Sequence, residues 1–170
     1  MRYFNGFSLH GEEGFFNAYL IQSDLCVAGF SYGAQQAFEY VYNTTRRVDR
    51  LLLFSPAFFQ TQKPSFIRTQ LRYFKNGQEA YIQQFLANTA YPSQVDLSAY
   101  LKTGTPGELE ALLTYCWDSD KIKEVIGRGT TIEVFLGSED RIIDAAAAFE
   151  FFSANTVTYF IKGAGHLLMD

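Results

Sequence analysis

The chain has 170 residues and a formal net charge of −4; 48% of its residues are hydrophobic and 19% are charged. This composition excludes collagen-like, disordered and coiled-coil proteins, and the length is that of one domain. No apolar run approaches the roughly 20 residues that cross a bilayer, and residues 1–14 lack the features of a signal peptide, so a cytoplasmic location is expected. Cys26 and Cys116 lie in apolar runs without metal-ligand spacing, and both are expected to be reduced and buried.

Five short apolar runs are predicted to form buried strands, at residues 2–5, 25–29, 51–54, 132–136 and 156–161. Helix-like stretches at 13–20, 32–42 and 144–152 lie between them. Alternating strands and helices are typical of a mostly parallel sheet with crossover helices, so the predicted fold class is α/β.

The alternation is interrupted between residues 58 and 128, which carry helix signals, aromatic residues and scattered Pro and Gly. This segment is predicted to be a helical insertion over the sheet, within a single domain that spans residues 1–170. Its first helix should begin at Pro64, because proline is preformed for the first helical turn, and should run to Lys75. Asn76 and Gly77 should end it.

Basic residues are concentrated between residues 43 and 76, where seven Lys and Arg stand against the single acid Asp49. On the predicted helix, Arg68, Arg72 and Lys75 are spaced i, i+4 and i+7 and so share one face. Such a charged stripe is either a solvated surface or a docking patch for an anionic partner. Composition does not choose between the two.

The most specific motif is Gly29-Phe30-Ser31-Tyr32-Gly33, a G-x-S-x-G sequence where a predicted strand meets a predicted helix. Glycines are needed there because the turn is so sharp that side chains would collide, and the serine is held at its top. Ser31 is therefore the candidate nucleophile.

Two backbone amides are candidates for an oxyanion hole. The amide of Tyr32 lies at the start of the predicted helix, directly after Ser31, and can donate to an oxyanion. The second donor should come from the loop after the first strand, where Gly6 permits a close backbone approach and the amide of Phe7 is the candidate. A plain strand-ending turn explains that loop equally well.

A nucleophilic serine needs a base, and the chain has two histidines. His166 follows the last predicted strand and is the candidate base; the alternative is a buried histidine that only satisfies its hydrogen bonds. His10 lies in a polar loop and is expected to be exposed and without a task. Asp140 follows the fourth predicted strand and is the candidate acid that holds the imidazole; Asp144 is the competitor, better explained as a helix cap. The order Ser, Asp, His along the chain is that of the α/β-hydrolases.

Several motifs carry a resemblance to a known family: Asn-Gly-Phe after the first strand, Gly-Phe-Ser-Tyr-Gly-Ala, Leu-Leu-Leu-Phe-Ser-Pro, the basic stretch at 66–71, the strand at 132–137 and Gly-His-Leu-Leu. With them the chain resembles the short pimeloyl-acyl-carrier-protein methyl ester esterases of biotin synthesis, of the BioV type. The resemblance implies a compact α/β-hydrolase fold with a helical lid at about 58–128. It also implies a cytoplasmic carboxylesterase that removes the methyl group from the pimeloyl chain on its acyl carrier protein and releases methanol. No cofactor or metal is implied, and no nucleic acid or membrane partner.

By motif position, the resemblance assigns the nucleophile to Ser31, the acid to Asp140 and the base to His166. Larger relatives use lid arginines to hold carrier and acyl chain, which makes Arg68 and Arg72, with Lys75 beside them, candidates for binding the carrier. The chain departs from the usual α/β-hydrolase pattern in starting at what looks like the third strand and in lacking His-Gly before the first turn.

Two other functions are compatible with the same residues. One is a general esterase or acyl thioesterase that acts on free small esters, with the basic stripe as plain surface. The other is a noncatalytic binding protein on a hydrolase scaffold, because a fold does not fix a function. The complete Ser, Asp and His set argues against the binding protein.

Overall fold

The computed structural model describes all residues from 1 to 170. Five strands form one sheet in the order β1-β2-β3-β4-β5, and every neighbouring pair is parallel. The strands are β1 (Arg2–Phe4), β2 (Cys26–Phe30), β3 (Arg50–Phe54), β4 (Thr131–Gly137) and β5 (Val157–Ile161). The predicted α/β class and the positions of all five predicted strands are confirmed, because buried parallel strands appear in a sequence as short continuous apolar runs. The prediction that all five are buried is wrong for β1 and β5, which lie at the two edges of the sheet and are partly exposed.

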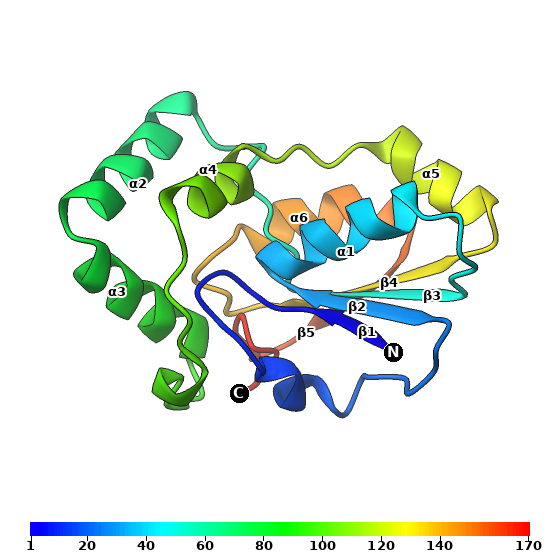
Figure 1. Ribbon diagram of the computed structural model, residues 1–170, viewed down its shortest axis with the longest axis horizontal. Helices are drawn as coiled ribbons and strands as arrows, with labels where there is room; N and C mark the ends of the chain where they lie inside the picture. The colour runs from blue at the N-terminus through cyan, green and yellow to red at the C-terminus, as the bar shows by residue number, and fades with distance from the viewer.

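The connections between strands lie on both faces of the sheet (Figure 1). Helices α1 (Tyr32–Asn43), α5 (Ser119–Gly127) and α6 (Ala145–Ser153) cover one face. From β2 to β5 each strand lies beside the previous one, always on the same side. Right-handed crossovers between such strands must all pass over the same face of the sheet. The connection from β1 to β2 holds the short 3₁₀-helix η1 (Glu12–Phe16) and passes over the other face, so it has the opposite, rare hand.

An aromatic row lines the face that η1 covers. Phe30, Phe54, Phe135 and Tyr159 are register partners on β2, β3, β4 and β5. Their side chains pack along the row, with ring centroids 5.3 Å apart for Phe54 and Phe135 and 4.8 Å for Phe135 and Tyr159. Phe16 of η1 stacks on Phe54 at 4.5 Å. Aromatic side chains therefore cover the part of the sheet that has no helix of full length over it.

The prediction of a helix at residues 13–20 is wrong in both its type and its length. The structure has only the five-residue 3₁₀-helix η1 there. Gly14 disfavours a regular helix, and the three-residue repeat of a 3₁₀ turn places Phe16 and Tyr19 together, each against the aromatic row. The expectation of two buried thiols is half wrong, since Cys26 is buried and Cys116 is exposed.

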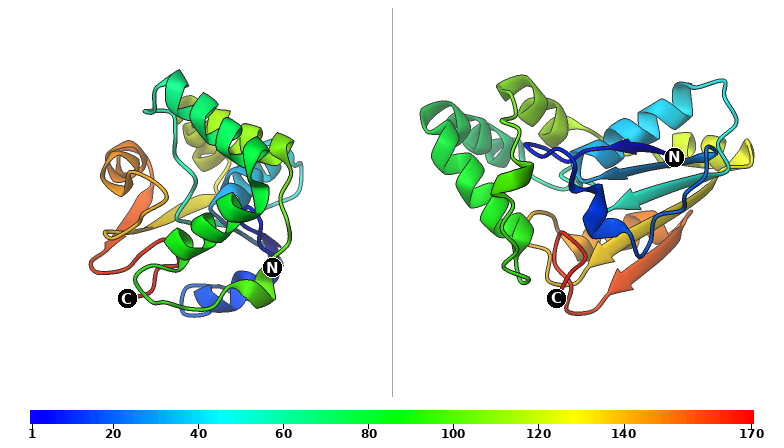
Figure 2. Two further views of the ribbon diagram at one scale, coloured as in Figure 1. Left: turned by 90° about the vertical axis from the view of Figure 1, so that its left-hand side faces the viewer. Right: turned by 60° about the horizontal axis from the view of Figure 1, so that its bottom comes forward.

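The segment predicted as a helical insertion holds four α-helices. Three of them, α2 (Pro64–Asn76), α3 (Gln78–Ala90) and α4 (Pro106–Thr114), lie beyond the carboxyl ends of the strands (Figure 2), with the short 3₁₀-helix η2 (Ser98–Tyr100) between α3 and α4. The fourth, α5, packs beside α1. We use "cap" below for α2, α3 and α4 only. None of the helices is long and apolar enough to cross a membrane.

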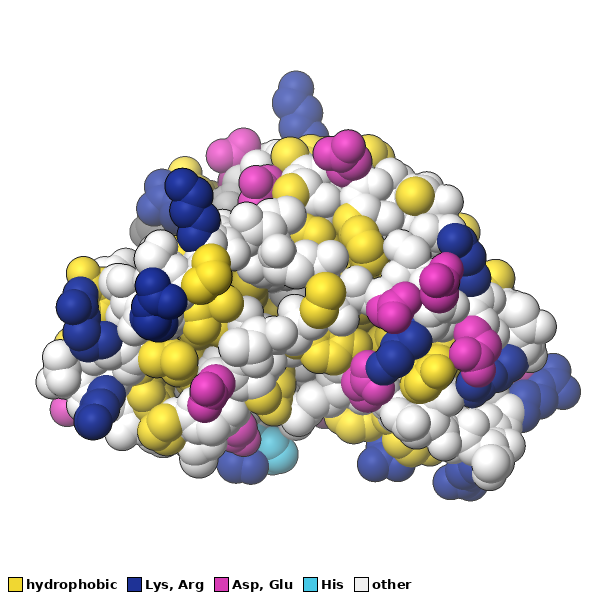
Figure 3. All heavy atoms as spheres, turned by 90° about the horizontal axis from the view of Figure 1, so that it is seen from above, with side chains coloured by type: hydrophobic (Ala, Val, Ile, Leu, Met, Phe, Trp, Pro, Cys, Tyr) yellow, Lys and Arg dark blue, Asp and Glu magenta, His cyan; other side chains and the backbone are white.

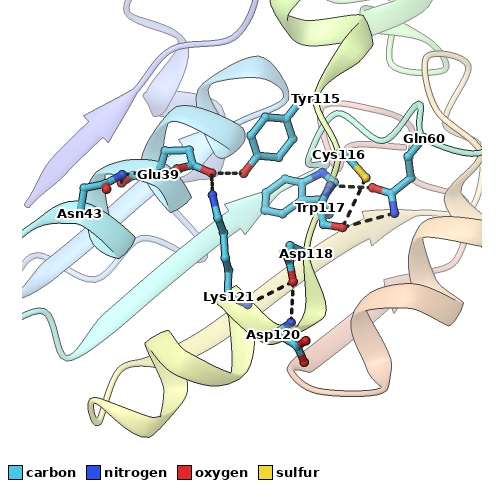
Figure 4. Close-up of polar contacts among 9 residues, drawn as sticks. All are labelled: Glu39, Asn43, Gln60, Tyr115, Cys116, Trp117, Asp118, Asp120 and Lys121. Atoms are coloured by element: carbon cyan, nitrogen blue, oxygen red, sulfur yellow. Dashed lines mark hydrogen bonds and ion pairs between the residues drawn. The ribbon is translucent and has the colours of Figure 1, made fainter.

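The chain that returns from the cap is tied to the sheet layer by polar contacts (Figure 4). The hydroxyl of Tyr115 donates to Glu39 Oε1 of α1 at 2.7 Å, and Lys121 Nζ of α5 donates to the same oxygen at 3.2 Å. The amide of Trp117 donates to Gln60 Oε1 at 2.7 Å. These contacts fix residues 115–121 to α1 and to the loop after β3, so α5 belongs to the body of the fold and not to the cap.

Candidate active site

Ser31 lies in the sharp turn between β2 and α1. Its φ of 54° and ψ of −114° are in a region that non-glycine residues rarely adopt. Glycines make the turn possible: a Cβ at Gly29 would collide with the Gly33 carbonyl, and a Cβ at Gly33 would collide with the carbonyl oxygens of Phe4 and Asn5. The G-x-S-x-G motif thus presses the start of α1 against the end of β2 and against the loop after β1.

His166 reaches Ser31 from the loop after β5. Its Nε2 lies 2.9 Å from Ser31 Oγ, and its ring packs on Phe30 with centroids 4.9 Å apart. The backbone carbonyl of His166 accepts a hydrogen bond from Ser55 Oγ at 2.7 Å. The imidazole is fully buried, so its position is fixed by packing as well as by hydrogen bonds.

Asp140 completes a continuous chain of hydrogen bonds. Its Oδ2 lies 2.6 Å from His166 Nδ1, and its Oδ1 accepts the amides of Ile142 and Ile143 at 2.7 and 3.1 Å. With the Nδ1 proton donated to Asp140, Nε2 is free to accept the Ser31 proton. The arrangement can therefore generate a nucleophilic alkoxide-like oxygen at Ser31.

Asp144 has a different partner. Its carboxylate accepts the amide of Ala147 at 3.0 Å and caps the start of α6. His10 is exposed and forms no hydrogen bond with any of the three residues. The structure therefore brings together Ser31, Asp140 and His166, and leaves Asp144 and His10 outside.

Tyr32 and Phe7, the two oxyanion candidates, line one polar cavity of about 340 Å³ together with Gln36 and Glu108. The amide of Tyr32 belongs to the first turn of α1, where N–H groups lack partners within the helix. The side chain of Phe7 is buried against the cap, 6.1 Å from Phe74 of α2 and 5.5 Å from Phe85 of α3. The loop that carries the Phe7 amide is therefore in contact with the cap.

A second, largely apolar cavity of about 530 Å³ lies between the cap and the loop that carries Asp140. Phe59, Phe66, Leu109, Leu113 and Ile143 are among its lining residues. Arg141 is its only basic lining residue. Ser31 is only 1% exposed and lines neither cavity.

Arg68, Arg72 and Lys75 are exposed on α2, and none of them forms an ion pair. Figure 3 shows Lys and Arg side chains gathered at the end of the molecule where α2 lies. Arg46, Arg47 and Arg50 lie near the opposite, amino-terminal ends of the strands, whereas Lys63 directly precedes α2. The single basic region in the sequence is thus two separate surfaces, and only the one on α2 is close to the site.

Three buried polar residues that support the site were not predicted from the sequence. Ser55 fixes the His166 backbone. Gln35, buried in α1, donates to the carbonyls of Ala57 and Leu112 at 3.0 and 3.1 Å and joins α1 to α4. Glu12 is a buried acid whose Oε1 accepts the amide of Gly6 at 2.6 Å. Each is a polar residue whose partner lies far along the chain or in a loop, so no local periodicity points to it.

Comparisons with known proteins support the fold. No family model and no curated protein sequence matches the chain. Among solved structures, Est816, described as an N-acyl homoserine lactone degrading enzyme, is similar with a TM-score of 0.61 and 14% identity, over 96% of this chain and 70% of that one. The chain has the α/β-hydrolase fold.

Two further structures support the same fold. A bromoperoxidase from Bacillus anthracis has a TM-score of 0.60 and 17% identity over 84% of this chain and 60% of its own. The naproxen esterase from Bacillus subtilis has a TM-score of 0.59 and 16% identity over 84% of this chain and 53% of its own. The chain thus spans between half and two thirds of the length of these two proteins.

Proposed function

We propose that the protein is a serine ester hydrolase in which Ser31 is the nucleophile, His166 the base and Asp140 the acid that orients it. The observation that carries the proposal is the unbroken hydrogen-bond chain from Ser31 Oγ to His166 Nε2, and from His166 Nδ1 to Asp140 Oδ2. A noncatalytic binding protein has no need of a strained serine and a buried histidine held in this order.

The proposed reaction follows from that chain. Ser31 Oγ attacks the ester carbonyl carbon while its proton moves to His166 Nε2, and the imidazolium formed is stabilised by Asp140. The carbonyl oxygen becomes an oxyanion that accepts the amides of Tyr32 and Phe7. Collapse of this intermediate expels the alcohol, which takes the proton from His166. A water molecule then attacks the acyl-serine by the same route and releases the carboxylic acid.

A direct test uses a fluorophosphonate and p-nitrophenyl esters. The wild-type protein should be labelled at Ser31 and should hydrolyse the esters, whereas Ser31→Ala should do neither. Ser65→Ala, which changes an exposed serine of α2, is the matched control and should behave as wild type. A wild-type protein that is folded, unlabelled and inactive on every ester would overturn the proposal.

We further propose, within this function, that the substrate is the pimeloyl methyl ester carried by acyl carrier protein. The sequence resemblance supports this substrate, and so do an apolar cavity that suits an acyl chain and an unpaired basic stripe on α2 that suits an acidic carrier. Product masses after incubation with the carrier-bound ester and with the free methyl ester test it. Rapid demethylation of the free ester alone would favour a general small-ester esterase.

A further inference from the structure

Glu12 is a buried carboxyl for which the proposed reaction has no role. Its exposed fraction is 0%, and no Lys, Arg or His pairs with it. Oε1 accepts the Gly6 amide at 2.6 Å and the Tyr3 hydroxyl at 3.4 Å, while Oε2 has no hydrogen-bond partner. Burying a carboxyl with one oxygen unpartnered is costly, so an apolar side chain of similar length would serve stability better. Packing alone therefore does not account for this residue.

The hydrogen bond from Gly6 ties η1 to the loop after β1, which lies directly against the nucleophile turn. A Cβ at Gly6 would come within 2.7 Å of the ring of Phe30, the residue before Ser31. Phe7 is the next residue along, and its amide is the proposed second oxyanion donor. This hydrogen bond holds the peptide that joins Asn5 to Gly6. The carbonyl of Gly6, which belongs to the next peptide, accepts the amide of Leu9 at 3.2 Å. With the peptides on both sides of Gly6 held, the direction of the Phe7 N–H is restricted.

The same short element also supports the base. Phe16 of η1 packs on Phe30 with ring centroids 4.9 Å apart, and Phe30 packs on His166 at the same distance. Glu12 and Phe16 thus link η1 to two separate parts of the site, the loop on one side and the imidazole on the other. An element of five residues that makes both contacts is well placed to set their relative position.

We propose that Glu12 is a positioning residue that orients the oxyanion-hole loop through its hydrogen bond with the Gly6 amide. The inference rests on the serine hydrolase function proposed above. A preorganised donor stabilises the transition state because it is already aimed at the developing charge, and the loss of one such donor costs about 10²–10³-fold in kcat. A donor that is present but loosely held should cost less, roughly 10–100-fold.

The test compares variants at Glu12 with the same changes at Glu13, the exposed neighbour of equal charge. Glu12→Met keeps the length of the side chain and removes the acceptor, so kcat for a p-nitrophenyl ester should fall roughly 10–100-fold with KM nearly unchanged. Glu12→Gln keeps an acceptor oxygen and should stay within about threefold of wild type. Both Glu13 variants should match wild type. Wild-type kcat in Glu12→Met would overturn the inference.

A second readout separates positioning from general loosening of the fold. A trifluoromethyl ketone adds to Ser31 Oγ, passes the serine proton to His166 and leaves an oxyanion in the hole. Its affinity for Glu12→Met should fall by the same factor as kcat. If kcat falls and the ketone binds as tightly as before, Glu12 does not act through the oxyanion hole.

Three further outcomes have their own reading. If Glu12→Met does not fold, Glu12→Asp replaces it, because the shorter acid keeps the charge but loses reach to Gly6, and it should show the same losses. If wild type itself is neither labelled by a fluorophosphonate nor active on esters, the proposed function has failed. If wild type is active and all Glu12 variants match it, only the inference on Glu12 has failed.

Discussion

Asp140 and Asp144 are close in the sequence, but their carboxylates have different partners. Asp140 holds the imidazole of His166, whereas Asp144 caps α6. Asp140→Asn should therefore lower turnover by roughly 10⁴-fold, because an amide favours the wrong imidazole tautomer. Asp144→Asn keeps a capping side chain and should be mild. Steady-state kinetics on a p-nitrophenyl ester decide between them, and the reverse ranking would move the acid role to Asp144.

Ser31 and His166 should show losses of similar size. Ser31→Ala and His166→Ala are each expected to reduce kcat by roughly 10⁴–10⁶-fold, because members of a triad act as a unit. The double variant should be hardly worse than either single variant. Additive losses, measured by kcat of all three variants, would show that the two residues act independently.

The buried carboxyl of Glu12 should make stability depend on pH. Burial raises the pKa of Glu12 above its ordinary value of 4.5, so the folded chain holds this proton more tightly than the unfolded chain, and Tyr3 and Glu13 are its titratable neighbours. Stability due to this group is then highest at low pH and falls as the pH rises from about 4.5 through the raised pKa. Glu12→Gln removes this slope.

The measurement is the melting temperature of both proteins across pH 4 to 8. The melting temperature of Glu12→Gln relative to wild type should increase as the pH rises. Glu13→Gln, at an exposed position, should track wild type across the range. A difference in melting temperature between Glu12→Gln and wild type that stays constant with pH would show that burial does not raise the pKa of Glu12.

At the scale of elements, the sequence predicted strands better than the small connections. Strand bounds agree within one or two residues because the buried strands are continuous apolar runs. The helix that begins at Pro64 ends at Asn76, one residue beyond the predicted Lys75 and directly before Gly77. The site residues Ser31, Asp140 and His166 stood out because each follows a strand. Glu12 and Gln35 did not, because their partners become neighbours only once η1 and α4 fold against the sheet.

Helix α2 allows the carrier proposal to be tested. Arg68→Ala combined with Arg72→Ala should raise KM for a carrier-bound ester and leave hydrolysis of a small free ester unchanged, because these exposed charges lie away from the reacting carbonyl. Salt should reproduce the effect in wild type, since the Debye length is only about 8 Å at physiological ionic strength. The double variant should respond less to salt.

Arg46→Ala with Arg47→Ala is the matched control, because it removes the same charge from the surface near the amino-terminal ends of the strands. It should leave KM for the carrier-bound ester near the wild-type value. If both double variants raise KM equally, net charge and not docking at α2 is responsible. Equal losses on the carrier-bound and free esters would assign the stripe to structure.

On the scale of the whole molecule, Gln35 joins α1, which begins directly after the buried Ser31, to α4 of the cap, and we expect this contact to limit access to Ser31. Gln35→Met keeps the length of the side chain but removes the hydrogen bonds to Ala57 and to Leu112 of α4. We expect the free energy of unfolding to fall by about 1–3 kcal/mol, and fluorophosphonate labelling of Ser31 to become faster. Gln83→Met, the same change at an exposed position of α3, is the control. Slower labelling would contradict a closing role for this contact.

The edge position of β1 has a consequence for how the molecule loses structure. β1 is three residues long, lies at the edge of the sheet and pairs only with β2, so β1, η1 and the loop between them are joined to the rest by few backbone hydrogen bonds. Segments of this kind open locally before the core unfolds. The triad residues follow β2, β4 and β5, whereas one proposed oxyanion donor lies on this segment. On heating, activity should therefore decline while the core strands still protect their amides from hydrogen exchange.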